Sequence, residues 1–260
     1  MPRSTILTIA NSSYRNHAER LVYSLRQTGY RGEITVLTDE DNFHIAGCTM
    51  HHMCFRDYGG KNLNDARWLQ VDLDLPFHIG DRVMYMDCDM VVLPRAPIAK
   101  LFKHDFGASI VDRVGGWEHM VPHIKRFLGG VWDGKVYIGV PFVFKVTPQA
   151  REFFRKQRIF GFLPASIGFG NMIAYNLACQ RYRAPKTIVP RDKIIYWFDI
   201  EADKPEQSLR IQNKLSRRKW FIHYGGAKHK LVAELEYKTL MVHPEVEYLP
   251  RLMPASQYFL

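Results

Sequence analysis

The chain has 260 residues, of which 47% are hydrophobic and 24% charged, and its formal net charge at pH 7 is +10. This length and composition are typical of a globular protein with a sizeable core, and no apolar run reaches the roughly 18 residues that a membrane span requires. The N-terminal segment has too short an apolar stretch for a signal peptide, and four irregularly spaced cysteines favour free thiols over a disulfide framework. We therefore expect one domain over residues 1–260, located in the cytoplasm.

The first hundred residues alternate strand-like and helix-like segments. Residues 4–10 are β-branched and apolar, which predicts a buried strand, and residues 16–29 carry apolar side chains at helical spacing, with Gly29 as the stop. Residues 32–41 predict the next strand and residues 63–73 a second helix. This β-α-β order favours a parallel sheet with crossover helices.

The later segments continue the α/β pattern. Residues 82–94, 106–112 and 136–146 predict strands. Helices are predicted after Thr147, which serves as an N-cap followed by proline, and across residues 168–182. The predicted fold class is α/β with a mainly parallel sheet flanked by helices, and in such sheets ligands bind at the carboxyl ends of the strands.

Two carboxylates interrupt the apolar segment RVMYMDCDMVVLP: Asp87 and Asp89 lie on either side of Cys88. Side chains at i and i+2 share one face of a strand, and at a strand end they can instead straddle a turn. Buried like charges disfavour each other unless a cation neutralises them, and carboxylate oxygens suit a divalent ion that also binds phosphates. The alternative is a solvated pair in a loop, but the apolar residues on both sides favour a metal site.

Two segments resemble a known enzyme family. DRVMYMDCDMVVL resembles the Asp-x-Asp metal-binding strand of GT-A-fold glycosyltransferases, in particular family 8, which includes glycogenin and lipopolysaccharide galactosyltransferases. In FIHYGGAKHK, His223 and Gly226 match a late His-x-x-Gly motif of that family. Its phosphate-binding lysine corresponds to Lys228, one residue early, or to Lys230, one residue late.

This resemblance implies the GT-A fold, a UDP-sugar donor and a transfer that retains configuration. It also implies that Asp87, Asp89 and His223 hold Mn²⁺ or Mg²⁺, since an imidazole nitrogen can complete such a site. Residues 1–110 then form the nucleotide-sugar-binding half, and residues 111–260 form the donor-sugar and acceptor half with a basic C-terminal region.

The resemblance assigns further contacts more loosely. Those to the nucleoside fall at the end of the first strand and in the loop after it: Thr8, Ala10, Asn11 and Tyr14. Arg67 is placed near the diphosphate and Asp112 near the donor sugar. The structural alternatives are a helix cap for Asn11, core packing for Tyr14 and a surface ion pair for Arg67.

The chain departs from the family at two places in the donor site. The family has Asn-x-Gly before a strand, where this chain has Tyr-Ile-Gly at residues 137–139. An Asp-Gln-Asp-like triplet of the family is replaced by GFGNM at residues 168–172, which leaves Asn171 as the polar candidate beside Asp112. The choice of sugar and the catalytic side chain are therefore open.

The acceptor is suggested by an uneven distribution of charge. Residues 181–230 contain 13 Lys or Arg against 5 Asp or Glu, which favours an anionic partner over a neutral glycan. We predict a metal-dependent glycosyltransferase acting on a glycan or glycolipid such as lipopolysaccharide, with peripheral membrane contact possible. One alternative is the same chemistry on hydroxymethylated DNA, which the basic segment also favours. Another is a non-catalytic module that binds nucleotide-sugars or nucleic acid.

Overall fold

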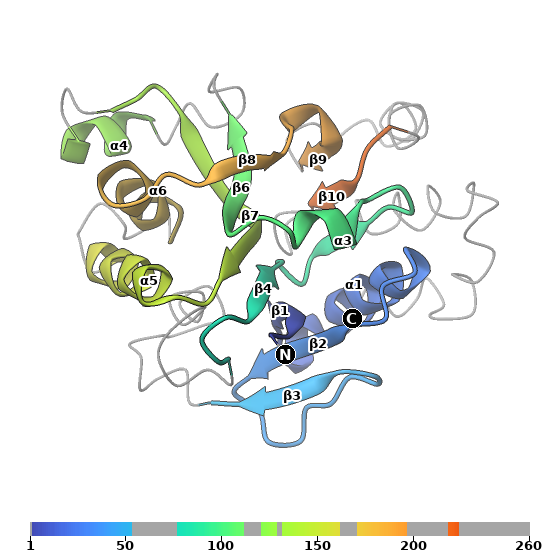
Figure 1. Cartoon of the computed structure of the whole chain (residues 1–260). Helices are drawn as coiled ribbons and strands as arrows, with labels where there is room; N and C mark the ends of the chain where they lie inside the picture. The colour runs from blue at the N-terminus through green and yellow to red at the C-terminus, as the bar shows by residue number, and fades with distance from the viewer. Residues whose placement is uncertain are drawn as a thin grey trace. The chain divides into compact units, whose positions relative to one another are not determined.

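The computed structural model describes residues 2–53, 77–111, 121–128, 132–161, 171–196 and 218–223 (Figure 1). The chain forms two compact units that alternate along the sequence. The first unit comprises Met1–Arg15, Gly32–Asp87 and Ala99–Arg191, and the second comprises Asn16–Arg31, Cys88–Ile98 and Asp192–Leu260.

A seven-stranded sheet organises the first unit. Its strands are β1 (Ser4–Ile9), β2 (Glu33–Thr38), β3 (Thr49–His52), β4 (Arg82–Tyr85), β6 (Phe106–Val111), β7 (Val136–Lys145) and β8 (Lys186–Val189). The spatial order is β3-β2-β1-β4-β7-β6-β8, and β7 runs antiparallel to both of its neighbours while the other pairs are parallel. The predicted α/β class with a mainly parallel sheet is confirmed.

The central strands of this sheet are buried on both faces, which explains their continuous apolar runs. Every residue of β1 after Ser4 is buried, and so is every residue of β2 after Glu33. A cluster of aromatic rings lies between β7 and the helices that follow it: Phe142 of β7 packs within 6.5 Å of Phe153 and within 5.5 Å of Tyr175, centroid to centroid.

Among its described residues, the first unit has three helices of eight or more residues: α4 (Val121–Leu128), α5 (Pro148–Gly161) and α6 (Asn171–Arg181). The predicted start of α5 is confirmed, because Thr147 Oγ1 accepts a hydrogen bond from the backbone N–H of Ala150 at 3.0 Å. Helices α5 and α6 pack against each other, and α6 also contacts β7 and α4 (Figure 1).

The second unit holds a smaller sheet of three strands in the order β5-β10-β9. Its elements are α1 (Arg15–Gln27), β5 (Met90–Val92), β9 (Ile194–Tyr196) and β10 (Phe221–His223). Strand β10 runs antiparallel to β5 and parallel to β9. Helix α1 contacts β5, since Ser24 Oγ accepts a hydrogen bond from the backbone N–H of Val92 at 3.0 Å. The helix ends just before Gly29, whose φ of 84° is readily adopted only by glycine.

The described chain also contains the 3₁₀ helices η1 (Ser12–Tyr14) and η7 (Arg191–Lys193), the helical turn α3 (Ile98–Leu101), and a turn at residues 88–89. This last turn divides the predicted strand over residues 82–94 into β4 and β5, which belong to different sheets. The predicted helix over residues 63–73 lies outside the described residues. None of the described helices has the length and apolar character needed to cross a membrane.

Candidate metal and nucleotide site

The candidate site begins at the carboxyl edge of two adjacent parallel strands, β1 and β4. Leu7 pairs with Tyr85, and the backbone N–H of Met86 continues the ladder by donating to the carbonyl of Leu7 at 3.0 Å. Because the strands are parallel, Asp87 and the loop after Ile9 leave the sheet at the same edge. This is the edge at which α/β sheets bind ligands.

Asp87 is held at the end of β4 by a local hydrogen bond. The hydroxyl of Tyr85 donates to Asp87 Oδ1 at 2.8 Å, and the Asp87 side chain is buried, at 3% exposure. Tyr85 is itself almost fully buried in the sheet, so it fixes the direction of the carboxylate. The sequence analysis did not predict this role of Tyr85. The signal that could have indicated it is the position of Tyr85 two residues before Asp87.

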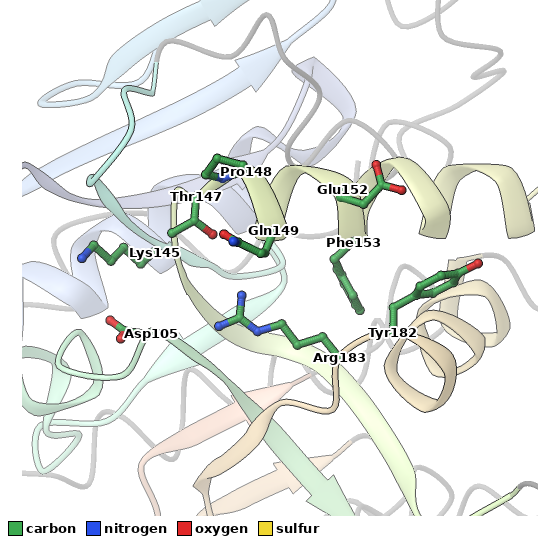
Figure 2. Close-up of a pocket in the computed structure, with 9 residues that line it drawn as sticks. All are labelled: Asp105, Lys145, Thr147, Pro148, Gln149, Glu152, Phe153, Tyr182 and Arg183. Carbon is green, nitrogen blue, oxygen red and sulfur yellow. The ribbon is translucent and has the colours of Figure 1, made fainter.

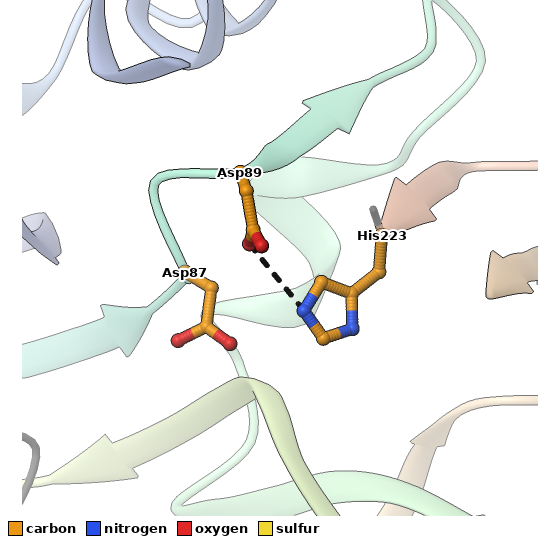
Figure 3. A group of neighbouring side chains, drawn as sticks. All are labelled: Asp87, Asp89 and His223. Atoms are coloured by element: carbon orange, nitrogen blue, oxygen red, sulfur yellow. Dashed lines mark ion pairs between the residues drawn. The ribbon is translucent and has the colours of Figure 1, made fainter. Parts of the chain in front are cut away.

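Asp89 and His223, far apart in the sequence, meet through the small sheet. The register of β5 and β10 places His223 opposite Met90, the residue directly after Asp89. His223 Nε2 lies 3.4 Å from Asp89 Oδ1, as Figure 3 shows, and both residues are buried, at 7% and 6% exposure. The ring of Tyr196 on β9 packs edge-on against the His223 ring, with centroids 5.9 Å apart, and helps to orient the imidazole.

Asp87, Asp89 and His223 together offer two carboxylate oxygens and one imidazole nitrogen, all within 4.8 Å of one another (Figure 3). Chain connectivity keeps Asp87 close to Asp89, which lies two residues later. Ligands of an octahedral ion at about 2.1 Å lie roughly 3 to 4 Å apart, so small side-chain rotations would suffice for coordination. Two oxygens and a nitrogen form a donor set that fits Mn²⁺ or Mg²⁺.

Helix α1 adds two basic side chains that sequence reasoning missed. Arg20, which is 6% exposed, donates from Nη2 to His17 Nδ1 at 2.8 Å. Burial, and then the Arg20 charge, lower the pKa of His17 to about 4, against an opposing effect of the Asp89 carboxylate. At neutral pH His17 is therefore uncharged and accepts the Arg20 hydrogen bond. No sequence motif marks these two residues, because only tertiary packing relates α1 to Asp89.

The residues predicted to contact a nucleoside lie at the end of β1 and in the segment after it. Thr8 and Ala10 are fully buried, and Asn11 and Tyr14 are partly exposed. Asn11 has the alternative role named above, because its side chain caps η1 by accepting a hydrogen bond from Ser13 N at 3.2 Å. Asn11 and Tyr14 are thus the more accessible of the four at this edge of β1.

Five predicted site residues lie outside the described residues: Arg67, Asp112, Gly226, Lys228 and Lys230. Asn171 is the first residue of α6. The Tyr-Ile-Gly segment at residues 137–139 is part of β7. There Asn176 of α6 accepts a hydrogen bond from Tyr137 N at 2.7 Å and donates to Tyr137 O at 2.9 Å. Asn176 therefore has a structural role in joining the helix to the strand.

Comparison with solved structures identifies glycosyltransferases. WbbM, a bifunctional glycosyltransferase, aligns with a TM-score of 0.61 at 11% identity over 96% of this chain and 51% of its own. The galactosyltransferase LgtC, in complex with donor and acceptor sugar analogues, aligns with a TM-score of 0.52 at 14% identity over 87% of this chain and 88% of its own. GlyE of Streptococcus pneumoniae TIGR4 aligns with a TM-score of 0.55 at 12% identity over 99% and 62%.

These likenesses concern the fold. The chain has the mixed α/β fold of GT-A glycosyltransferases, as the sequence resemblance implied, and it spans about half the length of WbbM. No protein-family model and no curated protein matches the sequence. Membership of family 8 in particular stays a prediction.

Proposed function

We propose that this protein is a metal-dependent glycosyltransferase that moves a sugar from a nucleoside-diphosphate sugar to a hydroxyl group of a glycan or glycolipid. The observation that carries the proposal is the buried group of Asp87, Asp89 and His223 in a chain with a glycosyltransferase fold. Two buried carboxylates beside one imidazole are costly without a cation and match the ligands that a diphosphate-bound divalent ion needs.

In this proposal Asp87 and Asp89 would hold Mn²⁺ or Mg²⁺ through carboxylate oxygens, and His223 would complete the protein ligands through a ring nitrogen. When bound, the ion supplies Lewis-acid stabilisation of the negative charge on the departing diphosphate. The Tyr85 hydroxyl orients the Asp87 carboxylate, and the Tyr196 ring orients the His223 imidazole.

The other groups proposed here act on the donor. Tyr14 offers a ring for stacking on the base, which we take to be uracil, and Asn11 offers a polar contact beside it. Lys228 or Lys230, with the backbone around Gly226, balances the diphosphate charge after His223.

The proposed transfer retains configuration at the anomeric carbon. The bond from that carbon to the donor phosphate oxygen breaks, and a bond to the acceptor oxygen forms on the same face. The acceptor proton passes to the departing phosphate. Arg67 near the diphosphate, and Asp112 and Asn171 near the donor sugar, complete the proposed contacts.

The decisive experiment is sugar transfer or donor hydrolysis by the purified chain across a panel of UDP-, GDP-, CDP- and dTDP-sugars, with Mn²⁺, Mg²⁺ or EDTA. We expect release of the nucleoside diphosphate from a UDP-sugar only with metal present. Asp89→Asn should lower this rate by at least about 100-fold, since it removes a charged ligand. It should also remove the rise in melting temperature that metal and UDP produce together in the wild type.

The matched control is Asp192→Asn. Asp192 is also an aspartate, but its side chain is 70% exposed and its ion pair is with the neighbouring Lys193. This variant should keep the wild-type rate. Metal-linked binding of UDP-sugars without turnover of any donor would instead support the non-catalytic module, and no metal-linked binding at all would refute the proposal.

The acceptor is tested separately by offering lipopolysaccharide core, neutral oligosaccharide, and plain or hydroxymethylated DNA. We expect transfer to the anionic glycan or glycolipid, because the basic segment of residues 181–230 favours negatively charged partners. Transfer to hydroxymethylated DNA that weakens with added salt would identify the DNA-modifying alternative.

A further inference from the structure

A second concave site lies at the amino end of β4, away from the carboxylates. The pocket has a volume of about 650 Å³, within the range of sites that bind small molecules. It includes Lys145, which pairs with Arg82 at the start of β4, whereas Asp87 follows the end of that strand. Five residues of extended chain, from Arg82 to Asp87, span roughly 16 Å, so the pocket is separate from the metal ligands.

One end of the pocket is positively charged. Lys145 and Arg183 both line it, and in the described part of the chain neither makes an ion pair. The carboxylates that also line it are engaged elsewhere: Asp105 with Arg82 at 2.9 Å, and Glu152 with Arg155 at 2.7 Å and with Lys156 at 3.6 Å. The lining therefore carries two cationic groups that form no ion pair with a described carboxylate.

The first turn of α5 lies at the same end. Thr147 caps the N–H of Ala150, and Gln149 contributes its side-chain amide to the pocket lining. Figure 2 shows the Arg183 guanidinium reaching toward Thr147 and Gln149 at the start of this helix. The positive end of the helix dipole adds to the charges of Lys145 and Arg183, and the three together favour an anion.

The other end of the pocket is aromatic. Tyr182 is 49% exposed although its ring is large, and Phe153, which also lines the pocket, is buried. Lys156 and Phe160 hold the Tyr182 ring in place, at 5.4 Å from Nζ and 6.0 Å between centroids. An exposed aromatic ring with a hydroxyl group provides both an apolar surface and a hydrogen-bonding group, the combination that suits the face and hydroxyls of a sugar.

We propose that this pocket binds an anionic sugar, one that bears a phosphate or carboxylate group, separately from the proposed donor site. The anionic group contacts Lys145 and Arg183 at the start of α5, and the sugar ring lies against Tyr182. The proposal goes beyond sugar transfer, because it requires neither the metal nor a donor.

The test is a titration of the protein with four probes, in EDTA and at low salt, by calorimetry or by NMR chemical shifts. Glucose 6-phosphate and glucuronate are sugars that carry a phosphate and a carboxylate group, respectively. Glucose has the sugar ring without an anionic group, and inorganic phosphate is an anion without a sugar ring. We expect at least one anionic sugar to bind about tenfold or more tightly than glucose and than phosphate. Equal binding of phosphate alone would overturn the proposal.

Substitutions in the pocket lining test whether the anionic sugar binds there. Arg183→Gln should weaken binding of the anionic sugar at least about tenfold, since a charge-assisted contact is lost. The matched control Arg126→Gln removes a guanidinium from an exposed position on α4 and should leave binding unchanged. Because Arg183 also packs over the Phe106 ring at 4.4 Å, Lys145→Gln serves as a second variant and should weaken binding in the same direction. Full binding in both Arg183→Gln and Lys145→Gln would refute the assignment.

One further variant separates this proposal from the proposed function. Asp89→Asn should keep full binding of the anionic sugar while losing metal-dependent transfer. Loss of anionic-sugar binding in Asp89→Asn would assign the probe to the donor site and overturn the second site. Anionic-sugar binding by a wild-type protein that shows no transfer from any donor would leave the second site standing and the proposed function refuted.

Discussion

The charged side chains at the two ends of β4 differ in whether other groups of the protein neutralise them. At the amino end, Arg82 donates to the carbonyls of Phe102 and His104 at 3.0 Å each and pairs with Asp105 at 2.9 Å. At the carboxyl end, Asp87 is followed two residues later by a second buried carboxylate. The short strand thus begins with a charge that is compensated from within the protein and is followed by a pair of like charges that favours an added cation.

This difference between the two ends of β4 predicts that one end contributes to stability and the other to metal binding. A charged hydrogen bond that is satisfied internally stabilises the folded chain. Two like charges brought together in a buried place destabilise it until a cation binds, and binding then adds its own free energy to folding. Changes at the amino end should therefore alter stability with or without metal, whereas changes at the carboxyl end should alter the response to metal.

The largest expected effect is that of Asp87→Asn. The variant should lose the metal-dependent rise in melting temperature and at least about 100-fold in transfer rate, while its metal-free form becomes more stable by about 1 kcal/mol because a like-charge contact is removed. Thermal unfolding with and without Mn²⁺ measures both effects. Asp105→Asn is the matched control at the other end: its stability should fall by less than about 1 kcal/mol with an unchanged metal response. A metal-free Asp87→Asn protein that is less stable than wild type would contradict the view of the carboxyl end as destabilised.

At the amino end, Arg82→Met should lower the free energy of unfolding by about 2 to 3 kcal/mol. The variant loses two charge-assisted hydrogen bonds to carbonyls and one ion pair, while methionine retains much of the apolar stem. Urea unfolding should show the same loss in EDTA and in Mn²⁺. A loss that appears only with metal present would place Arg82 in the metal site and break the comparison.

Stability should also depend on pH through His17 in the second unit. Its pKa in the folded chain is lowered to about 4 from 6.5 by burial and the Arg20 charge, so between these values the unfolded chain binds more protons than the folded one. Stability should therefore rise with pH from about 4 to 6.5, by about 3 kcal/mol in total, and change little through this group above that. Asn can offer its side-chain oxygen near the position of Nδ1, so His17→Asn should flatten this part of the profile; an unchanged slope would exclude His17 as its source.

The smallest expected effect is that of Tyr85→Phe. Removing the hydroxyl that donates to Asp87 at 2.8 Å should cost about 1 kcal/mol of stability and weaken metal binding by about tenfold. Tyr137→Phe is the matched control, because the Tyr137 hydroxyl donates to Asp133 at 2.6 Å away from the metal ligands. The control should lose comparable stability and keep its metal affinity. Equal metal affinities in both variants would show that Tyr85 does not orient Asp87.

The helices and strands could be predicted from the sequence more readily than the pairing of the strands with one another. Apolar runs predicted β1, β2, β6 and β7 within a few residues, and the Thr147-Pro148 pair predicted the start of α5, because burial pattern and capping are local properties. The sequence left open whether residues 82–94 form one strand or are divided by a turn at the carboxylates, and the structure divides them into β4 and β5. Both halves are apolar, and only their pairing with different sheets separates them.

The candidate site likewise has one part that the sequence predicts and another that only the tertiary structure shows. The sequence by itself determined that Asp87 and Asp89 are neighbours at the end of a buried strand, since two residues of chain cannot place them far apart. Only the tertiary structure decided that His223 lies 3.4 Å from Asp89 and that Lys145 and Arg183 share a pocket with Tyr182. Strand pairing and helix packing are long-range interactions, and their partners depend on the free energy of the whole chain rather than on any local pattern.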